Sequence, residues 1–183
     1  VPLETLEPGC DGYNNGNPCL NWRRTNVTPN TQAADVPFSV TVNITDAFWN
    51  VVTSTSHDVY VRTWDDPNDI EPATKTATNG HAVFASANGD PIRLRRAGTT
   101  YVQAYDGSPT YPNLDNSVGS SRSQNITVTA GPAQKLVAIL PGQNLNQGAN
   151  TITEARQGVA TPKTAGTAFN VRVYLTDNYY NIK

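Results

Sequence analysis

Hydrophobic and polar residues alternate without a break from Phe38 to Thr45. Because successive side chains of a strand point to opposite faces, the apolar residues of this segment share one face, namely Phe38, Val40, Val42 and Ile44. The other face carries Ser39, Thr41, Asn43 and Thr45. The pattern predicts a strand with one face buried in a core.

Shorter apolar runs predict further strands, separated by turn-forming residues such as Asn79-Gly80 and Ala97-Gly98. We expect them near Asp58–Trp64, His81–Ser86, Pro91–Arg95, Thr99–Tyr105 and Gln124–Thr129. No 11-residue window shows a convincing helical period. The prediction is an all-β protein with an immunoglobulin-like β-sandwich.

Most of the chain's opening is repeated. Leu3–Gly9 recurs as Leu136–Gly142, and Ala34–Asp46 recurs as Ala165–Asp177, about 131 to 133 residues later. We therefore expect a complete module over residues 1–130, followed by a partial module over residues 131–183 that holds two strands and their connecting loop. The Gly-Pro linker at Ala130–Ala133 leaves little freedom, so we expect the two units to stack end to end.

The second copy of the alternating strand carries Phe169, Val171, Val173 and Leu175. These residues need an apolar partner face, which residues 131–183 do not supply. We interpret them as an assembly face that strands of a neighbouring subunit complete in a homopolymer. The chain beyond Pro132 is then expected to fold poorly without assembly. The other interpretation is that Lys183 marks only the end of a fragment.

The amino-acid composition limits the classes of function that the chain can have. Charged residues make up 15% and the net charge is -2, so the chain lacks the basic stripe that nucleic acid requires. No apolar run reaches the 18 residues of a membrane span. Cys10 and Cys19 enclose a loop rich in Gly, Asn and Pro, which favours a disulfide and an oxidising compartment. Two free thiols are the alternative.

Two turns place an Asp and an Asn four residues apart directly after an alternating strand, Asp46 to Asn50 and Asp177 to Asn181. We expect each Asp to cap its turn by side-chain hydrogen bonds. A metal-binding turn is the less favoured interpretation.

The segment Thr164–Asn181 resembles the signature "TAGTPF.V.V.A.DA.GN" of bacterial immunoglobulin-like repeats, the invasin-like and filamin-like tandem modules of cell-surface proteins. Phe38–Asn50 resembles it as well, and Ala130–Leu136 resembles the "AG.A.KL" that begins such a module. The resemblance implies the sandwich fold and a tandem arrangement. It says little about function, because one fold serves many functions.

The most acidic stretch carries Asp65, Asp66, Asp69 and Glu71, whose oxygens are of the kind that calcium prefers. The spacing matches no EF-hand loop, so a solvated acidic turn is the favoured interpretation and calcium the alternative. We expect no other cofactor. Arg93 and Arg95 are interpreted as outward charges that protect an edge strand, or as contacts for an acidic loop such as 65–71 of an adjacent subunit.

The sequence offers no catalytic constellation, because His57 and His81 have no nucleophile motif near them. We expect a non-enzymatic extracellular structural protein whose modules form a surface filament, stalk or layer. The alternative is an adhesin or accessory binding module that recognises a glycan or a protein ligand on its loops. Exposed aromatic residues would stack on a sugar, and the candidates are Tyr13, Trp22, Tyr101, Tyr105 and Tyr111.

Overall fold

The computed structural model describes residues 13–14, 17–18, 28–107 and 121–183. Strands dominate these residues, and helix is confined to single turns such as η1 (Ser86–Asn88) and α2 (Ile152–Ala155). The predicted all-β class is therefore confirmed. Cys10 and Cys19 lie outside the described residues, although a short hairpin of β1 (Tyr13–Asn14) and β2 (Asn17–Pro18) lies between them.

Several small sheets build the first unit. One has the order β6-β5-β9, and another has the order β3-β10-β8. A third pairs β4 with β7 in antiparallel register, with Val40 opposite Phe84. Their bounds are β3 Gln32–Ala33, β4 Val40–Asn43, β5 Asp58–Thr63, β6 Lys75–Thr76, β7 His81–Phe84, β8 Gly98–Thr100, β9 Val102–Asp106 and β10 Ile126–Thr129.

One hydrophobic core joins these sheets. Phe38, Val40 and Ile44 are buried in it, as the alternation predicted, and Val42 packs against its edge. Phe84, Ile92, Leu94 and Ile126 are fully enclosed. Burial alternates along β7 and β10 because each strand presents one face to the core and the other to solvent.

The predicted strand over Thr99–Tyr105 is wrong in one respect, because the chain changes sheets at Tyr101. Residues before it form β8, which pairs with β10, and residues after it form β9, which pairs with β5. The predicted strand at Pro91–Arg95 is reduced to single bridges at Ile92 and Arg93. Its alternation holds, since Ile92 and Leu94 are buried.

The second unit is an antiparallel pair, β11 (Lys135–Ile139) and β14 (Arg172–Thr176), with a smaller pair between them, β12 (Asn144–Leu145) and β13 (Arg156–Gln157). Thr151 and Glu154 form a capping box that begins α2. A helix of one turn is too short to show a period, which is why the sequence did not predict it.

The two faces of the β11–β14 pair differ. One face packs Val137 and Ile139 against Ala149, Ala155 and Tyr180 in a small core of its own. The opposite face holds Leu136 opposite Leu175 and Ala138 opposite Val173, and it is open. The second unit thus has more internal packing than the sequence led us to expect, but only on one side.

All four residues of the predicted assembly face are exposed, and Val173 and Leu175 lie on this open side. Phe169, Val171, Val173 and Leu175 are 49%, 44%, 61% and 47% exposed. Phe169 and Val171 precede β14, so the paired strand is shorter than the alternating pattern. Their counterparts in the first unit, Phe38 and Val40, are buried because the hydrophobic core of that unit packs against them.

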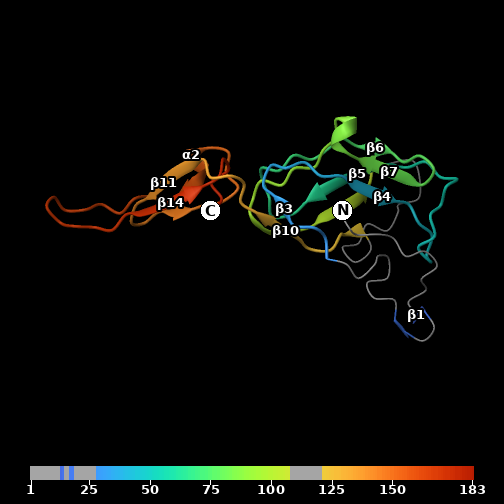
Figure 1. The fold of residues 1–183 in the computed structure, drawn as a ribbon, viewed down its shortest axis with the longest axis horizontal. Coiled ribbons are helices and arrows are strands. Elements are labelled where there is room, and N and C mark those ends of the chain that lie inside the picture. Colours follow the sequence, from blue (N-terminus) through green and yellow to red (C-terminus); the bar gives the residue numbers. More distant parts are fainter. Residues whose placement is uncertain (1–12, 15–16, 19–27, 108–120) are drawn as a thin grey trace.

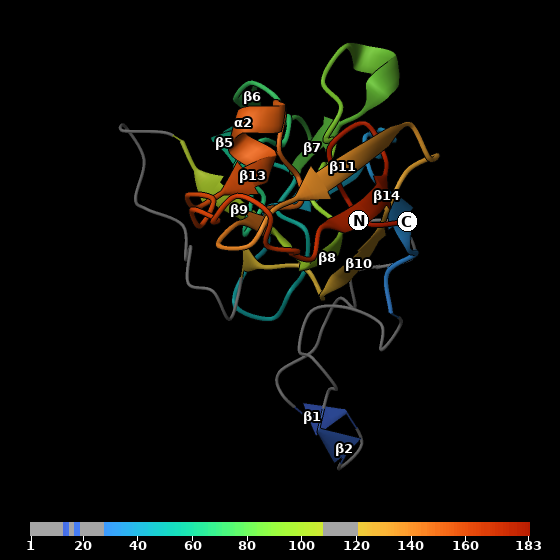
Figure 2. The ribbon, with the colours of Figure 1, turned by 90° about the vertical axis from the view of Figure 1, so that its left-hand side faces the viewer.

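The two units lie end to end along the longest axis of the molecule, with residues 28–107 and 121–130 on one side and residues 131–183 on the other (Figure 1). The view along that axis shows β11, β14 and α2 in front of the strands of the first unit (Figure 2). Within the described residues, no helix has the length and apolar character needed to cross a membrane.

Candidate functional site at the junction of the two units

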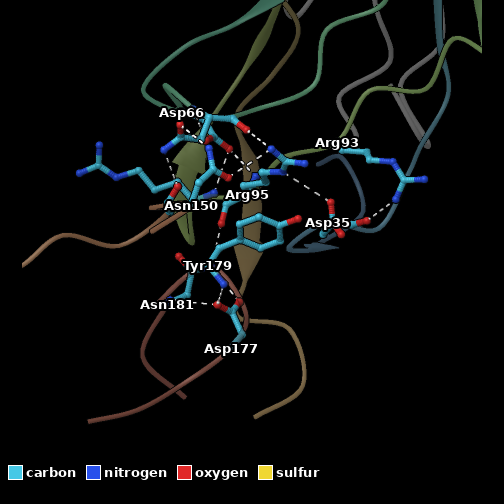
Figure 3. Close-up of polar contacts among 11 residues, drawn as sticks. Asp35, Asp66, Arg93, Arg95, Asn150, Asp177, Tyr179 and Asn181 are labelled. Carbon is cyan, nitrogen blue, oxygen red and sulfur yellow. Dashed lines mark hydrogen bonds and ion pairs between the residues drawn. The ribbon is translucent and has the colours of Figure 1, made fainter. Parts of the chain in front are cut away.

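The turn Asp177–Asn181, here called the docking turn, lies between the two units (Figure 3). Asp177 Oδ1 accepts hydrogen bonds from the backbone N–H groups of Tyr179 at 2.8 Å and Asn181 at 3.0 Å. Its Oδ2 accepts from Asn181 Nδ2 at 2.8 Å. The predicted capping by Asp177 is confirmed, and Asp46 caps its own turn in the same way.

The docking turn is held against the loop Arg95–Ala97 of the first unit, here called the socket. Asn181 Oδ1 accepts a hydrogen bond from Ala97 N at 2.8 Å, and Asn181 Nδ2 donates to the Arg95 carbonyl at 2.7 Å. Asn181 has no exposed surface, and Asp177 is 2% exposed. The carboxamide therefore pairs its acceptor and one of its donors with the backbone of the other unit, in a site without solvent.

The buried carboxylate of Asp66 holds the backbone of the socket in place. Asp66 Oδ2 accepts hydrogen bonds from the backbone N–H groups of Arg95 and Arg96, at 2.5 and 2.8 Å. These bonds fix the loop so that the Arg95 carbonyl and the Ala97 N–H face the second unit. Since Asp66 is only 5% exposed, the loss of its carboxylate would leave buried donors without an acceptor.

The Arg95 side chain extends over the same interface. Its guanidinium donates to the Asn68 carbonyl at 2.9 Å and to Asn150 Oδ1 at 3.3 Å, and it lies 4.7 Å from the centre of the Tyr179 ring. Asp35 forms an ion pair with it at 3.6 Å. Burial raises the pKa of the Tyr179 hydroxyl, although the charge of Arg95 lowers it.

A second set of contacts joins the units beside the socket. Asn68 Nδ2 donates to the Gly148 carbonyl at 2.9 Å, and Asn150 Nδ2 donates to Asn68 Oδ1 at 2.8 Å. The linker is tied as well, because Gly131 N donates to Asp177 Oδ2 at 2.8 Å. The second unit is therefore held to the first at the socket and through Asn68, and the linker between them is tied to the docking turn.

The four residues of the calcium prediction have separate partners. Asp66 serves the socket, while Asp69 and Glu71 accept hydrogen bonds from the Thr63 hydroxyl and the Thr63 N–H. The carbonyl of exposed Asp65 accepts from Arg96. In the part of the chain that the structure describes, no three His, Cys, Asp or Glu side chains gather to hold a metal ion. Calcium binding stays a prediction that calorimetry at millimolar calcium tests.

Sequence reasoning paired the basic residues with the acidic loop but placed that contact between subunits. In the structure, Arg95 and Arg96 meet the 65–68 loop of their own chain. Arg93 instead donates to the Asp35 carbonyl. The sequence analysis missed Asn68, Gly148 and Asn150, which follow no periodic pattern. It did find Asn181, through the repeated Asp and Asn spacing, but gave it no role between units.

Where the structure describes their side chains, the candidate sugar-stacking residues are stacked on other aromatic residues of the chain. Tyr105 stacks on Tyr60, with ring centres 5.1 Å apart. Tyr101 stacks on Trp64 at 6.1 Å and lies under the Arg122 guanidinium at 3.9 Å. Trp22 and Tyr111 lie outside the described residues, and so does the Tyr13 side chain. Glycan binding stays a prediction.

Asp69 makes the stability of the folded chain depend on pH. The pKa of its carboxyl is raised from 3.8 to about 6, chiefly by burial, with the charges of Glu71 and Asp66 adding to it and the bond from Thr63 opposing it. Because the folded pKa lies above the unfolded one, ionisation of Asp69 costs stability as the pH rises from about 4 to about 6. The Asp69→Asn variant keeps an acceptor for Thr63 and removes the charge.

We therefore expect Asp69→Asn to match the wild-type chain in stability below about pH 4 and to exceed it above about pH 6. Urea unfolding across this range measures the difference. Asp65→Asn, at an exposed neighbouring position, is the control. A difference that stays constant with pH contradicts the expectation.

No protein-family model matches the chain, and neither a curated protein nor a solved structure matches it.

Proposed function

We propose that the protein is a non-enzymatic structural protein of the cell surface or extracellular space, built of immunoglobulin-like sandwich modules joined end to end in a filament, stalk or layer. The observation that carries the proposal is the docking of Asn181, with no exposed surface, between Arg95 O and Ala97 N of the other unit. A flexible linker between independent binding domains needs no such contact. A filament or a stalk of modules needs a fixed angle between them.

Small-angle X-ray scattering of the intact chain tests this proposal. The wild-type curve should fit one elongated shape, and Asn181→Ala should broaden the distribution of distances because it removes both contacts with the socket. Asn50→Ala changes the equivalent residue of the exposed turn Asp46–Asn50 and serves as the control. A wild-type curve that requires many orientations of the two units would overturn the proposal.

The open face of the second unit supports assembly as the second part of the proposal. Leu136, Val173 and Leu175 form one apolar surface, on the side of β11 and β14 away from the small core. Exposed apolar surface of this kind favours burial against another chain. We propose that strands of a neighbouring subunit complete it, as strands of the first unit cover Phe38 and Val40.

We expect Val173→Glu to prevent self-association, because it places a charge in the middle of this face. Light scattering from about 1 µM to about 1 mM should show a rising mass for the wild-type chain and a constant monomer mass for the variant. Val159→Glu is the matched control, since Val159 is 87% exposed and lies outside β11 and β14. A wild-type chain that stays monomeric throughout would contradict the assembly face.

A further inference from the structure

The chain contains a second turn with the geometry of the docking turn. In Asp46–Asn50, here called the first turn, Asp46 Oδ1 accepts from the N–H groups of Phe48 and Asn50, both at 2.9 Å, and Oδ2 accepts from Asn50 Nδ2 at 3.1 Å. Trp49 has a φ of 64°, and its counterpart Tyr180 has a φ of 61°. A bridge closes each turn, Thr45 with Val51 and Thr176 with Ile182. The two turns therefore have the same backbone and the same internal hydrogen bonds.

Their surroundings are opposite. Asp177 and Asn181 of the docking turn are buried, whereas Asp46 and Asn50 are exposed and Phe48 is 55% exposed. Within the described residues, Asn50 Oδ1 accepts no hydrogen bond and the Phe48 ring has no cationic partner. Their counterparts, Asn181 Oδ1 and the Tyr179 ring, are the groups that contact Ala97 N and Arg95.

We infer that the first turn is a docking element for the socket end of another module of this kind. This inference rests on the proposed function, which it extends from one junction to a series. The partner would present a peptide C=O and N–H two residues apart, as Arg95 and Ala97 do, with an arginine over the Phe48 ring. The chain's own socket is filled by Asn181, so the partner socket belongs to another module.

The first turn is already in the conformation that docking requires. Its internal bonds to Asp46 hold the Asn50 carboxamide in place without a partner. The hydrogen bond from the Asn50 side chain lowers the pKa of Asp46, because it favours the ionised carboxylate that accepts this bond. Docking therefore orders few groups. The contact itself is small, so we expect a dissociation constant on the order of 1 mM between separate chains. Linkage within a tandem array would raise occupancy through effective concentration.

A titration between two forms of the intact chain tests the inference. The isotope-labelled wild-type chain has a free first turn, and the unlabelled Asn181→Ala variant supplies an emptied socket. Hydrogen exchange at Ala97 N–H verifies that the socket is open, and Asp177→Ala is a second variant that empties it. The control titrant is unlabelled wild-type chain, whose socket is filled.

We expect the Asn50 side-chain amide and the N–H signals of Phe48 and Trp49 to shift with the Asn181→Ala titrant and not with the wild-type titrant. The shifts should disappear when the labelled chain carries Asn50→Ala. No shift at about 1 mM, or equal shifts with both titrants, overturns the inference. If Ala97 N–H is unprotected in the wild-type chain, the proposed junction itself fails, and this outcome is distinct from a failure of the first turn alone.

Discussion

Replacing Asp177 with Ala is expected to release the second unit from the first and to lower the free energy of unfolding of residues 131–183 by about 3 kcal/mol or more. Asp177 accepts hydrogen bonds from four donors, which are Gly131 N, Tyr179 N, Asn181 N and Asn181 Nδ2. Alanine leaves these donors in a site that excludes water, since Asp177 is 2% exposed and Asn181 has no exposed surface. The hydrogen bonds that hold the linker and the turn are lost, and the contact with the socket is lost with them.

The chain supplies its own control for this substitution. Asp46→Ala removes the same three bonds within the first turn, but that turn is exposed and water replaces them. We expect a clearly smaller loss of stability. Urea unfolding combined with hydrogen exchange at Ala97 and Asn181 measures both variants. Equal losses for Asp177→Ala and Asp46→Ala would show that burial at the junction contributes nothing.

Gly148→Ala is expected to open the same junction by steric means. A Cβ atom at Gly148 would lie 2.6 Å from Arg96 Cβ and 2.9 Å from Arg96 Cα, closer than carbon atoms can approach. The Gly148 carbonyl also accepts the bond from Asn68, and its N–H donates to the Tyr179 carbonyl, so the backbone cannot shift without loss of both contacts. We expect the clash to lower the free energy of unfolding by about 1–3 kcal/mol, in addition to the cost of the backbone strain.

Gly166→Ala is the control that separates the cost of the clash from the cost of the backbone strain. Gly166 has the same φ of +80°, but a Cβ atom there would meet nothing within 4 Å. Gly166→Ala should therefore show only the strain of a left-handed alanine, about 1–2 kcal/mol. Scattering and thermal unfolding of both variants test the difference: Gly148→Ala should loosen the two units and Gly166→Ala should leave them fixed. A rigid Gly148→Ala chain would mean that the Arg96 contact does not define the junction.

Local chemistry made part of the structure predictable from the sequence. The alternation from Phe38 to Thr45 placed Phe38, Val40 and Ile44 in the core, and the Asp and Asn spacing predicted the capped turns. Both patterns depend on neighbours within a few residues. The change of sheet at Tyr101 did not follow from them, because strand-forming residues lie on both sides of it, such as Thr99 and Val102.

The junction was not predictable for a related reason. Its contacts join residues that are 55 to 86 positions apart, such as Arg95 with Asn150 and with Asn181. Asn and Arg side chains occur in many surface loops, so their identity gave no signal. Only the repeated turn pointed to the site, and the difference in burial between its two copies shows what each copy contacts.

The rigid connection of the two units can be measured by ¹⁵N relaxation of the backbone amides. We expect residues 28–107 and 121–183 to fit a single, elongated rotational diffusion tensor, with Gly131 as rigid as the strands on either side. Two separate correlation times, with the shorter one for residues 135–183 and fast motion at Gly131, would contradict it.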